Sequence, residues 1–117
     1  SVASGIGATT RATTGVWRGM PGTRQMAETL VREVVTVGQT QGINLPDQTV
    51  DDTMRLIDSW AEGHTTSMAK DLMEERPSEL EAAIGDVVRI GQELGVDVSL
   101  SNLIHNILLP QELKARS

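Results

Sequence analysis

Three consecutive hydroxyl side chains and a nearby glutamate have residue types and spacing that suit a polar site. Thr65, Thr66 and Ser67 follow one another, and Glu79 comes twelve residues after Ser67. Hydroxyls near a helix start offer hydrogen-bond donors to an anionic group, and a glutamate in a cleft can orient a catalytic group. The same residues also suit ordinary helix starts, where the helix dipole favours a first-turn glutamate in any protein. The two interpretations are a ligand site and a set of helix caps.

The elements that carry these residues are predicted to be helices. Pro21 suits a first helical turn and Gly42 suits a helix end, so we expect one long helix between them. A further helix is expected to follow Pro46 and to end at Gly63, and a short charged segment spans about 66–75.

The helix that carries Glu79 is predicted to start at Ser78 and to end at Gly95. Ser78 and Glu81 have the spacing of a capping box, in which the serine hydroxyl caps the first turn and the glutamate side chain reaches back. Its apolar face is predicted to comprise Leu80, Ile84, Val87 and Leu94.

The two ends of the chain have contrasting compositions. Residues 1–15 are rich in Gly, Thr and Ala, and Gly5 and Gly7 are interpreted as small residues that let another backbone approach closely. A last helix, about 100–109, is aliphatic almost all round and is expected to stop at Pro110. Its extra apolar face predicts self-association.

Since no long period-2 alternation is present, we expect an all-α domain of about five to six helices.

Composition excludes several classes of function. The chain has 117 residues, which suits a single domain, and a net charge of −6 with two Trp as its only aromatic residues. This argues against nucleic acid or an anionic membrane as a partner, because either would call for a clustered basic face. The absence of cysteine excludes a disulfide framework and fits a reducing compartment. His64 and His105 lack the paired spacing of a zinc helix, so we expect no metal site.

One stretch carries a more specific pattern. It reads TSMAKD from Thr66, then Arg76, then SELE from Ser78, and then Gly85. This resembles the C-terminal domain of the ketopantoate reductases (2-dehydropantoate 2-reductases), which have Ser-Ser-Met-x-x-Asp, a basic residue, Thr/Ser-Glu-Ile/Leu-Asp/Glu and Gly. The spacing from the serine to the glutamate is the same. The likeness continues in VVRIGQELGV, residues 87–96, and extends over nearly the whole chain.

The resemblance implies NADPH-dependent reduction of ketopantoate, or of a related 2-keto acid, to its 2-hydroxy acid in pantothenate and coenzyme A synthesis. It implies a cytoplasmic homodimer whose N-terminal Rossmann domain binds NADPH. Residues 1–117 would form the single helical C-terminal domain, like that of 6-phosphogluconate-dehydrogenase-like reductases. Ser67 and Thr66 would then bind the substrate, and Glu79 would support the acid–base network around the reacting carbonyl.

The likeness is incomplete at several positions. One family asparagine should fall near Ser4 and another near Thr14, Ile84 stands where the family has an asparagine before the glycine, and Ser99 replaces a proline. The resemblance implies that the family's general-acid lysine and Rossmann domain would lie before the first residue of this sequence. Its small, uncharged start predicts a piece of a larger protein, although removal of an initiator Met would also leave a small first residue. We therefore expect the 117 residues alone to be inactive. The alternative function is a stand-alone helical module that self-associates or binds another protein without catalysis.

Overall fold

The fold is entirely helical over residues 2–117, the part of the chain that the computed structural model describes. This part contains seven α-helices and one π-helical turn and no β-strand. The all-α prediction is confirmed, with more helices than the five or six expected. The elements are α1 (Ser4–Thr10), α2 (Thr14–Gly19), α3 (Pro21–Thr40), α4 (Gln48–Asp58), α5 (Ser67–Met73), the π-helical turn η1 (Glu81–Gly85), α6 (Asp86–Glu93) and α7 (Ser99–Arg116).

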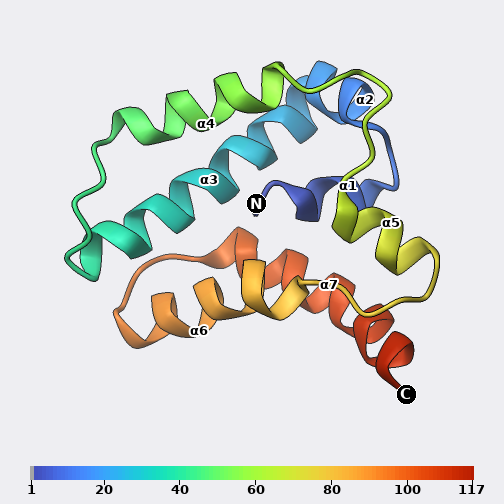
Figure 1. The fold of residues 1–117 in the computed structure, drawn as a ribbon. Helices are drawn as coiled ribbons and strands as arrows, with labels where there is room; N and C mark the ends of the chain where they lie inside the picture. The colour runs from blue at the N-terminus through green and yellow to red at the C-terminus, as the bar shows by residue number, and fades with distance from the viewer. Residues whose placement is uncertain (1) are drawn as a thin grey trace.

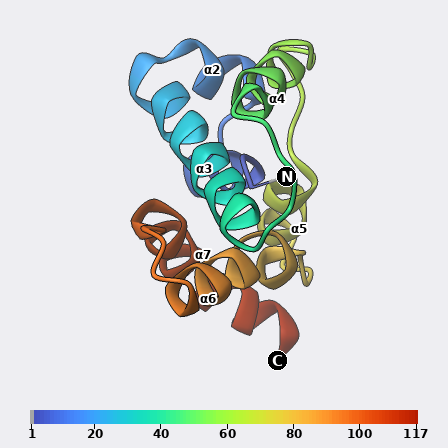
Figure 2. The ribbon, with the colours of Figure 1, turned by 90° about the vertical axis from the view of Figure 1, so that its left-hand side faces the viewer.

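Two helical hairpins enclose the first helix. Figures 1 and 2 show α3 with α4 on one side and α6 with α7 on the other, while α1 lies between them and α5 packs along α1. The core lies where these layers meet, and Ile6, Leu30, Ile84 and Ile104 are among its fully buried side chains. The residues predicted to bind substrate are Thr66, at the N-cap of α5, and Ser67, its first residue. The packing of α5 along α1 therefore holds them against the first helix of the chain.

The glycines of α1 allow this close packing. A Cβ added at Gly5 would lie 2.8 Å from Cδ1 of Ile84 and 2.9 Å from Cγ2 of Ile104. At Gly7, a Cβ would lie 2.9 Å from Oγ1 of Thr66. The glycines are thus closely approached as predicted, but the approaching atoms belong to side chains rather than to another backbone.

The long helix α3 begins and ends where the sequence indicates. Pro21 occupies its first position, and Gly42, two residues beyond its last residue Thr40, has a φ of 92°. An L-residue with a side chain is strained at such a positive φ, so a glycine suits this helix end.

The helix α4 ends at Asp58, so the prediction that it continues to Gly63 is wrong. Arg18 supplies the physical reason. Its Nη1 donates hydrogen bonds to the carbonyl oxygens of Ile57 at 2.9 Å and of Trp60 at 2.7 Å. Ile57 lies in the last turn of α4 and Trp60 lies beyond its end, so these bonds hold the chain in the conformation in which it leaves the helix.

A surface ion pair ties the end of α4 to α3. Arg24 donates to both carboxylate oxygens of Asp58, at 2.7 and 2.9 Å. The hydrogen bond from Arg24 lowers the pKa of Asp58 below its ordinary value and raises the pKa of Arg24. Because both side chains are well exposed, the pair contributes little to stability, about 1 kcal/mol at most.

The predicted single helix from Ser78 to Gly95 is interrupted by the π-helical turn. In that turn the N–H of Asp86 donates to the carbonyl of Glu81, five residues back. After the turn, Val87, Val88 and Gly91 are buried, whereas Leu94, predicted on the apolar face, is the residue that follows the end of α6 and is 41% exposed. The predicted end is correct, since Gly95 has a φ of 70°.

The last helix does not stop at Pro110. It continues to Arg116, although an internal proline removes one backbone hydrogen bond and costs about 3 kcal/mol. The two helical turns beyond the proline are held from outside the helix: Lys114 lies 2.9 Å from Glu75 in an ion pair. A buried carboxylate, Glu112, adds a stronger contact, which is described with the site.

We expect Gly5→Ala to lower the free energy of unfolding by about 1 to 3 kcal/mol, the range for overpacking a core. The added methyl would press on Ile84 and Ile104. Gly22→Ala is the matched control, because a Cβ at Gly22 meets no atom within 4 Å and alanine favours a helix by about 1 kcal/mol. Urea unfolding of both variants tests this, and equal stability of the two would contradict it.

Candidate functional site

A polar hollow of about 380 Å³ lies where α5 begins, and it contains two of the three residues predicted to form a site. Thr66 and Ser67 both line it, whereas Glu79 does not. The full lining consists of Ser4, Trp60, His64, Thr65, Thr66, Ser67 and Lys70. These residues come from the first helix, from the segment after α4 and from α5, so the hollow depends on the packing of α5 against α1.

The two predicted hydroxyls have different surroundings. Thr66 is buried and caps α5: its Oγ1 accepts a hydrogen bond from the N–H of Ala69 at 3.3 Å and donates one to the carbonyl of Ser4 at 3.4 Å. Ser67 is exposed, and its hydroxyl makes no hydrogen bond within residues 2–117. Thr66 therefore positions the start of α5, and Ser67 is the hydroxyl that can contact a ligand.

His64 was not predicted as a site residue, yet it is held in place at the hollow. Its Nδ1 lies 2.9 Å from Oγ1 of the fully buried Thr14, and its carbonyl accepts a hydrogen bond from the N–H of Thr14 at 2.8 Å. Its ring also packs against Trp60, with centroids 4.9 Å apart. Since Thr14 occupies Nδ1, Nε2 is the ring nitrogen left for a ligand. Its position beside the hydroxyl cluster was the only signal in the sequence.

Lys70 supplies the positive charge of the hollow. It follows Ser67 by three residues in α5, and this spacing places both side chains on the same helix face. Its ammonium group makes no ion pair among the residues that the structure describes. The spacing could have identified Lys70 from the sequence.

Glu79 lies outside the hollow, at the start of the turn that leads into η1. Its side chain is exposed, and its carboxylate has no hydrogen bond or ion pair over residues 2–117. The structure therefore brings Ser67 together with His64 and Lys70, and leaves Glu79 as a separate, unengaged carboxylate.

The capping box predicted at this turn is wrong. The hydroxyl of Ser78 does accept the N–H of Leu80 at 3.2 Å, so the serine is a cap. The N–H of Ser78, however, donates to the two carboxylate oxygens of Glu112 at 3.0 and 3.1 Å. Glu81 instead lies 2.6 Å from Nε2 of His105. A carboxylate from α7 therefore takes the place that the sequence assigned to Glu81.

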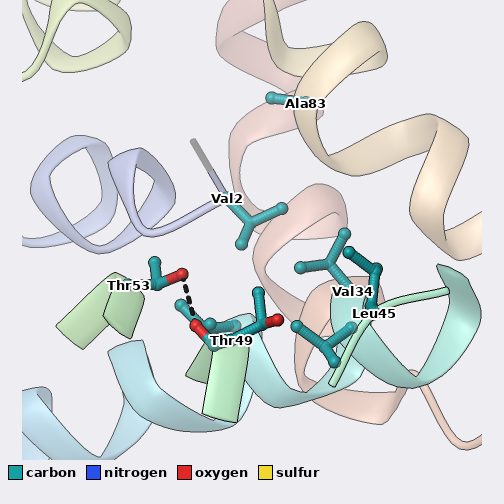
Figure 3. A pocket seen from close by; sticks show the side chains of 8 residues that line it. Val2, Val34, Leu45, Thr49, Thr53 and Ala83 are labelled. Atoms are coloured by element: carbon teal, nitrogen blue, oxygen red, sulfur yellow. Dashed lines mark hydrogen bonds between the residues drawn. The ribbon is translucent and has the colours of Figure 1, made fainter. Parts of the chain in front are cut away.

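A second hollow of about 350 Å³ is lined mostly by apolar side chains, together with two threonines. Figure 3 shows Val2, Val34, Leu45 and Ala83 around it, and the hydroxyl of Thr53 donating to the carbonyl of Thr49 at 2.8 Å. Its lining contains no ionisable side chain. It therefore offers no acid, base or charged ligand group.

Residues 2–117 contain neither a cluster of metal-ligating side chains nor a helix suited to a membrane. No group of three or more His, Asp or Glu side chains could hold a metal ion. In the same range, none of the helices has the length and hydropathy that crossing a bilayer requires.

Comparison with known proteins places this chain in a family. Residues 1–112 match the family model of the ketopantoate reductase PanE/ApbA C terminal. A 2-dehydropantoate 2-reductase from Nostoc sp. is 34% identical over 86 residues, which cover 74% of this chain and 27% of that protein. A dimeric ketopantoate reductase from Staphylococcus aureus superimposes with a TM-score of 0.89 at 27% identity, over 96% of this chain and 39% of that one.

A more distant structure shares the fold alone. The ternary complex of D-mandelate dehydrogenase with NADH and anilino(oxo)acetate has a TM-score of 0.82 at 19% identity, covering 98% of this chain and 38% of that chain. In these comparisons this chain thus spans between about a quarter and two fifths of the length of the proteins it resembles.

We expect Thr14→Val to change the tautomer population of His64, because the hydroxyl that bonds Nδ1 is removed while side-chain shape is kept. It should also lower the free energy of unfolding by about 1 kcal/mol. The control is Thr13→Val, since the Thr13 side chain makes no capping hydrogen bond. Imidazole ¹⁵N chemical shifts report the tautomer, and identical His64 shifts in wild type and Thr14→Val would contradict the prediction.

Proposed function

Because this chain belongs to the family of ketopantoate reductase C-terminal domains, we propose that it is the substrate-closing domain of a reductase acting on ketopantoate or a related 2-keto acid. The product would be the corresponding 2-hydroxy acid. The proposal includes the family's place in pantothenate and coenzyme A synthesis and a cytoplasmic location.

The observation that supports this proposal is that two polar side chains on one face of α5, Ser67 and Lys70, make no side-chain hydrogen bond or ion pair within residues 2–117. A 2-keto acid presents a carboxylate next to a carbonyl, and it needs a cation and hydrogen-bond donors to be held. Ser67 offers a hydroxyl and Lys70 an ammonium group in the same polar hollow. His64, fixed by Thr14, adds a third polar group at a defined position. We assign Ser67 to substrate binding, with Thr66 acting as its structural support.

Glu79 is assigned the catalytic support role. An exposed carboxylate without a partner inside the domain is available to a group from another part of the full-length protein. In the proposal that group is the general-acid lysine, which Glu79 orients toward the substrate oxygen. In this proposal the lysine belongs to a part of the full-length protein outside residues 1–117.

The cofactor that we propose is NADPH, held mainly by an N-terminal Rossmann domain of the full-length protein. Residues 2–117 do not fit it as a main binding site, because they contain no strand and hence no βαβ unit with a glycine-rich turn. The 117 residues by themselves would therefore not catalyse the reaction. The domain would contribute substrate contacts and exclude water from the cleft.

The alternative function, a self-association module, is favoured by one feature of α7. Leu103 and Ile107 are 53% and 45% exposed, one helical turn apart on the same face. A second copy of the chain would bury them. This face is compatible with the reductase proposal as well, where it would serve a homodimer.

We expect Ser67→Ala in the full-length reductase to weaken substrate binding by about 1 to 3 kcal/mol, the cost of leaving a polar partner unsatisfied. KM for the keto acid should rise while the melting temperature stays unchanged, because Thr66 still caps α5. Ser59→Ala, at an exposed serine outside the hollow, is the control. Steady-state kinetics with an unchanged KM would remove Ser67 from the site.

We expect Glu79→Gln in the full-length reductase to lower kcat and kcat/KM together, by about 100-fold, since a misplaced catalytic group costs that much. The thermal melt should not change, because the helix start is held by Ser78 and Glu112. The control is Glu93→Gln, at an exposed glutamate at the end of α6, and it should retain wild-type kinetics. A melt that falls in step with activity would show Glu79 to be a folding residue instead.

A further inference from the structure

Two buried glutamates each close the start of a helix that belongs to a different part of the chain. Glu33 in α3 accepts the N–H of Ser101 at 2.8 Å and its hydroxyl at 2.6 Å, at the start of α7. Glu112 in α7 accepts the N–H of Ser78 at 3.0 Å and its hydroxyl at 2.6 Å. The two arrangements are nearly the same, but they stand at different helix starts. Only the second adjoins a proposed site residue.

The Glu112 arrangement fixes the backbone on both sides of Glu79. Before it, the N–H and hydroxyl of Ser78 are bound to Glu112, and the carbonyl of Ser78 accepts a hydrogen bond from Arg116 at 3.3 Å. After it, the N–H of Leu80 donates to the Ser78 hydroxyl at 3.2 Å. The peptide that carries Glu79 therefore has little freedom to shift, while its carboxylate remains exposed.

Arg116 completes the arrangement by orienting the buried carboxylate. Its Nε donates to Oε1 of Glu112 at 2.9 Å, and the carboxylate is 99% buried by side-chain area. Burying a carboxylate oxygen without a hydrogen-bond partner costs free energy, so a buried carboxylate keeps the orientation in which its oxygens are hydrogen-bonded. Rotation of Glu112 would break its bonds to Ser78 and Arg116 together.

We propose that Glu112 and Arg116 are positioning residues for Glu79, so that the segment of α7 beyond Pro110 sets the location of the Glu79 carboxylate. The inference rests on the proposed function of Glu79. It accounts for the continuation of α7 past its proline, which is needed to bring Glu112 to Ser78. Neither residue touches the substrate in this proposal.

The test compares Glu112→Gln with Glu33→Gln in the full-length reductase. Each change keeps side-chain volume and removes one charged cap, so both variants should lose similar stability. Only Glu112→Gln should lower kcat, by roughly 10- to 100-fold, because a shift of about 1 Å at a catalytic group has that effect. KM should stay near wild type in both, since Ser67 and Lys70 are not altered.

A second comparison shows whether the effect passes through Glu79. Adding Glu112→Gln to Glu79→Gln should cause no further loss of kcat, because the group that Glu112 positions is already removed. A full additional loss in the double variant would overturn the proposal. So would a wild-type kcat for Glu112→Gln when Glu79→Gln is impaired, and in that case the proposed function would still stand.

If Glu112→Gln fails to fold, Arg116→Met decides the question. Arg116 is half exposed, and its removal leaves the bonds between Glu112 and Ser78 in place. A kcat several-fold below that of Glu33→Gln at a comparable loss of melting temperature supports the positioning role, and a kcat equal to that of Glu33→Gln overturns it. A wild-type kcat in Glu79→Gln itself would instead refute the proposed function from which this inference starts.

Discussion

The bond between Glu112 and Ser78 is the constraint on which the C-terminal half of the molecule depends. A carboxylate with 1% exposure must have its oxygens satisfied within the protein. Ser78 and Arg116 satisfy them, and this requires α7 to continue past Pro110 in spite of the lost backbone bond. The same bond defines where the helix containing η1 and α6 begins. The start of the helix that contains η1 and α6, the length of α7 and the backbone position of Glu79 therefore all depend on the buried side chain of Glu112.

The N-terminal half depends on small residues in α1. Gly7 leaves room for Thr66, which allows α5 to lie along α1 and places Ser67 and Lys70 at the hollow. A further contact, between Thr14 and His64, joins the segment before α5 to the start of α2. Contacts separated by about fifty residues in sequence thus hold a group of polar side chains in one place, which suits a binding site on a rigid scaffold.

The sequence predicts the helices of this fold well where local chemistry decides them, as at Pro21, Gly42 and Gly95. It fails where a distant side chain decides. Arg18 ends α4 early, and Glu112 replaces Glu81 as the partner of Ser78. Neither partner can be inferred from spacing, because each comes from a helix about forty or thirty-four residues away.

In the candidate site, too, neighbouring residues are predictable from the sequence, whereas contacts with distant residues are not. Thr66 and Ser67 adjoin each other in sequence and in the hollow, and the resemblance of their local motif to the reductase family is what assigns both to one site. His64 was missed because its fixed orientation depends on Thr14, fifty residues earlier. The π-helical turn was missed as well. At Gly85, the last residue of that turn, a Cβ would lie only 2.5 Å from the carboxylate of Glu81, which also contacts His105.

The placement of the two tryptophans gives this domain distinctive optical properties. The chain contains no Phe or Tyr, so its near-ultraviolet absorption and its intrinsic fluorescence arise from Trp17 and Trp60 alone. Trp17 is 1% exposed and shielded from solutes, whereas Trp60 borders the polar hollow with its ring beside the imidazole of His64. A solute that quenches tryptophan fluorescence should therefore reduce the emission of Trp60 more than that of Trp17. The emission of Trp60 reports directly on the contents of the hollow, without any added label.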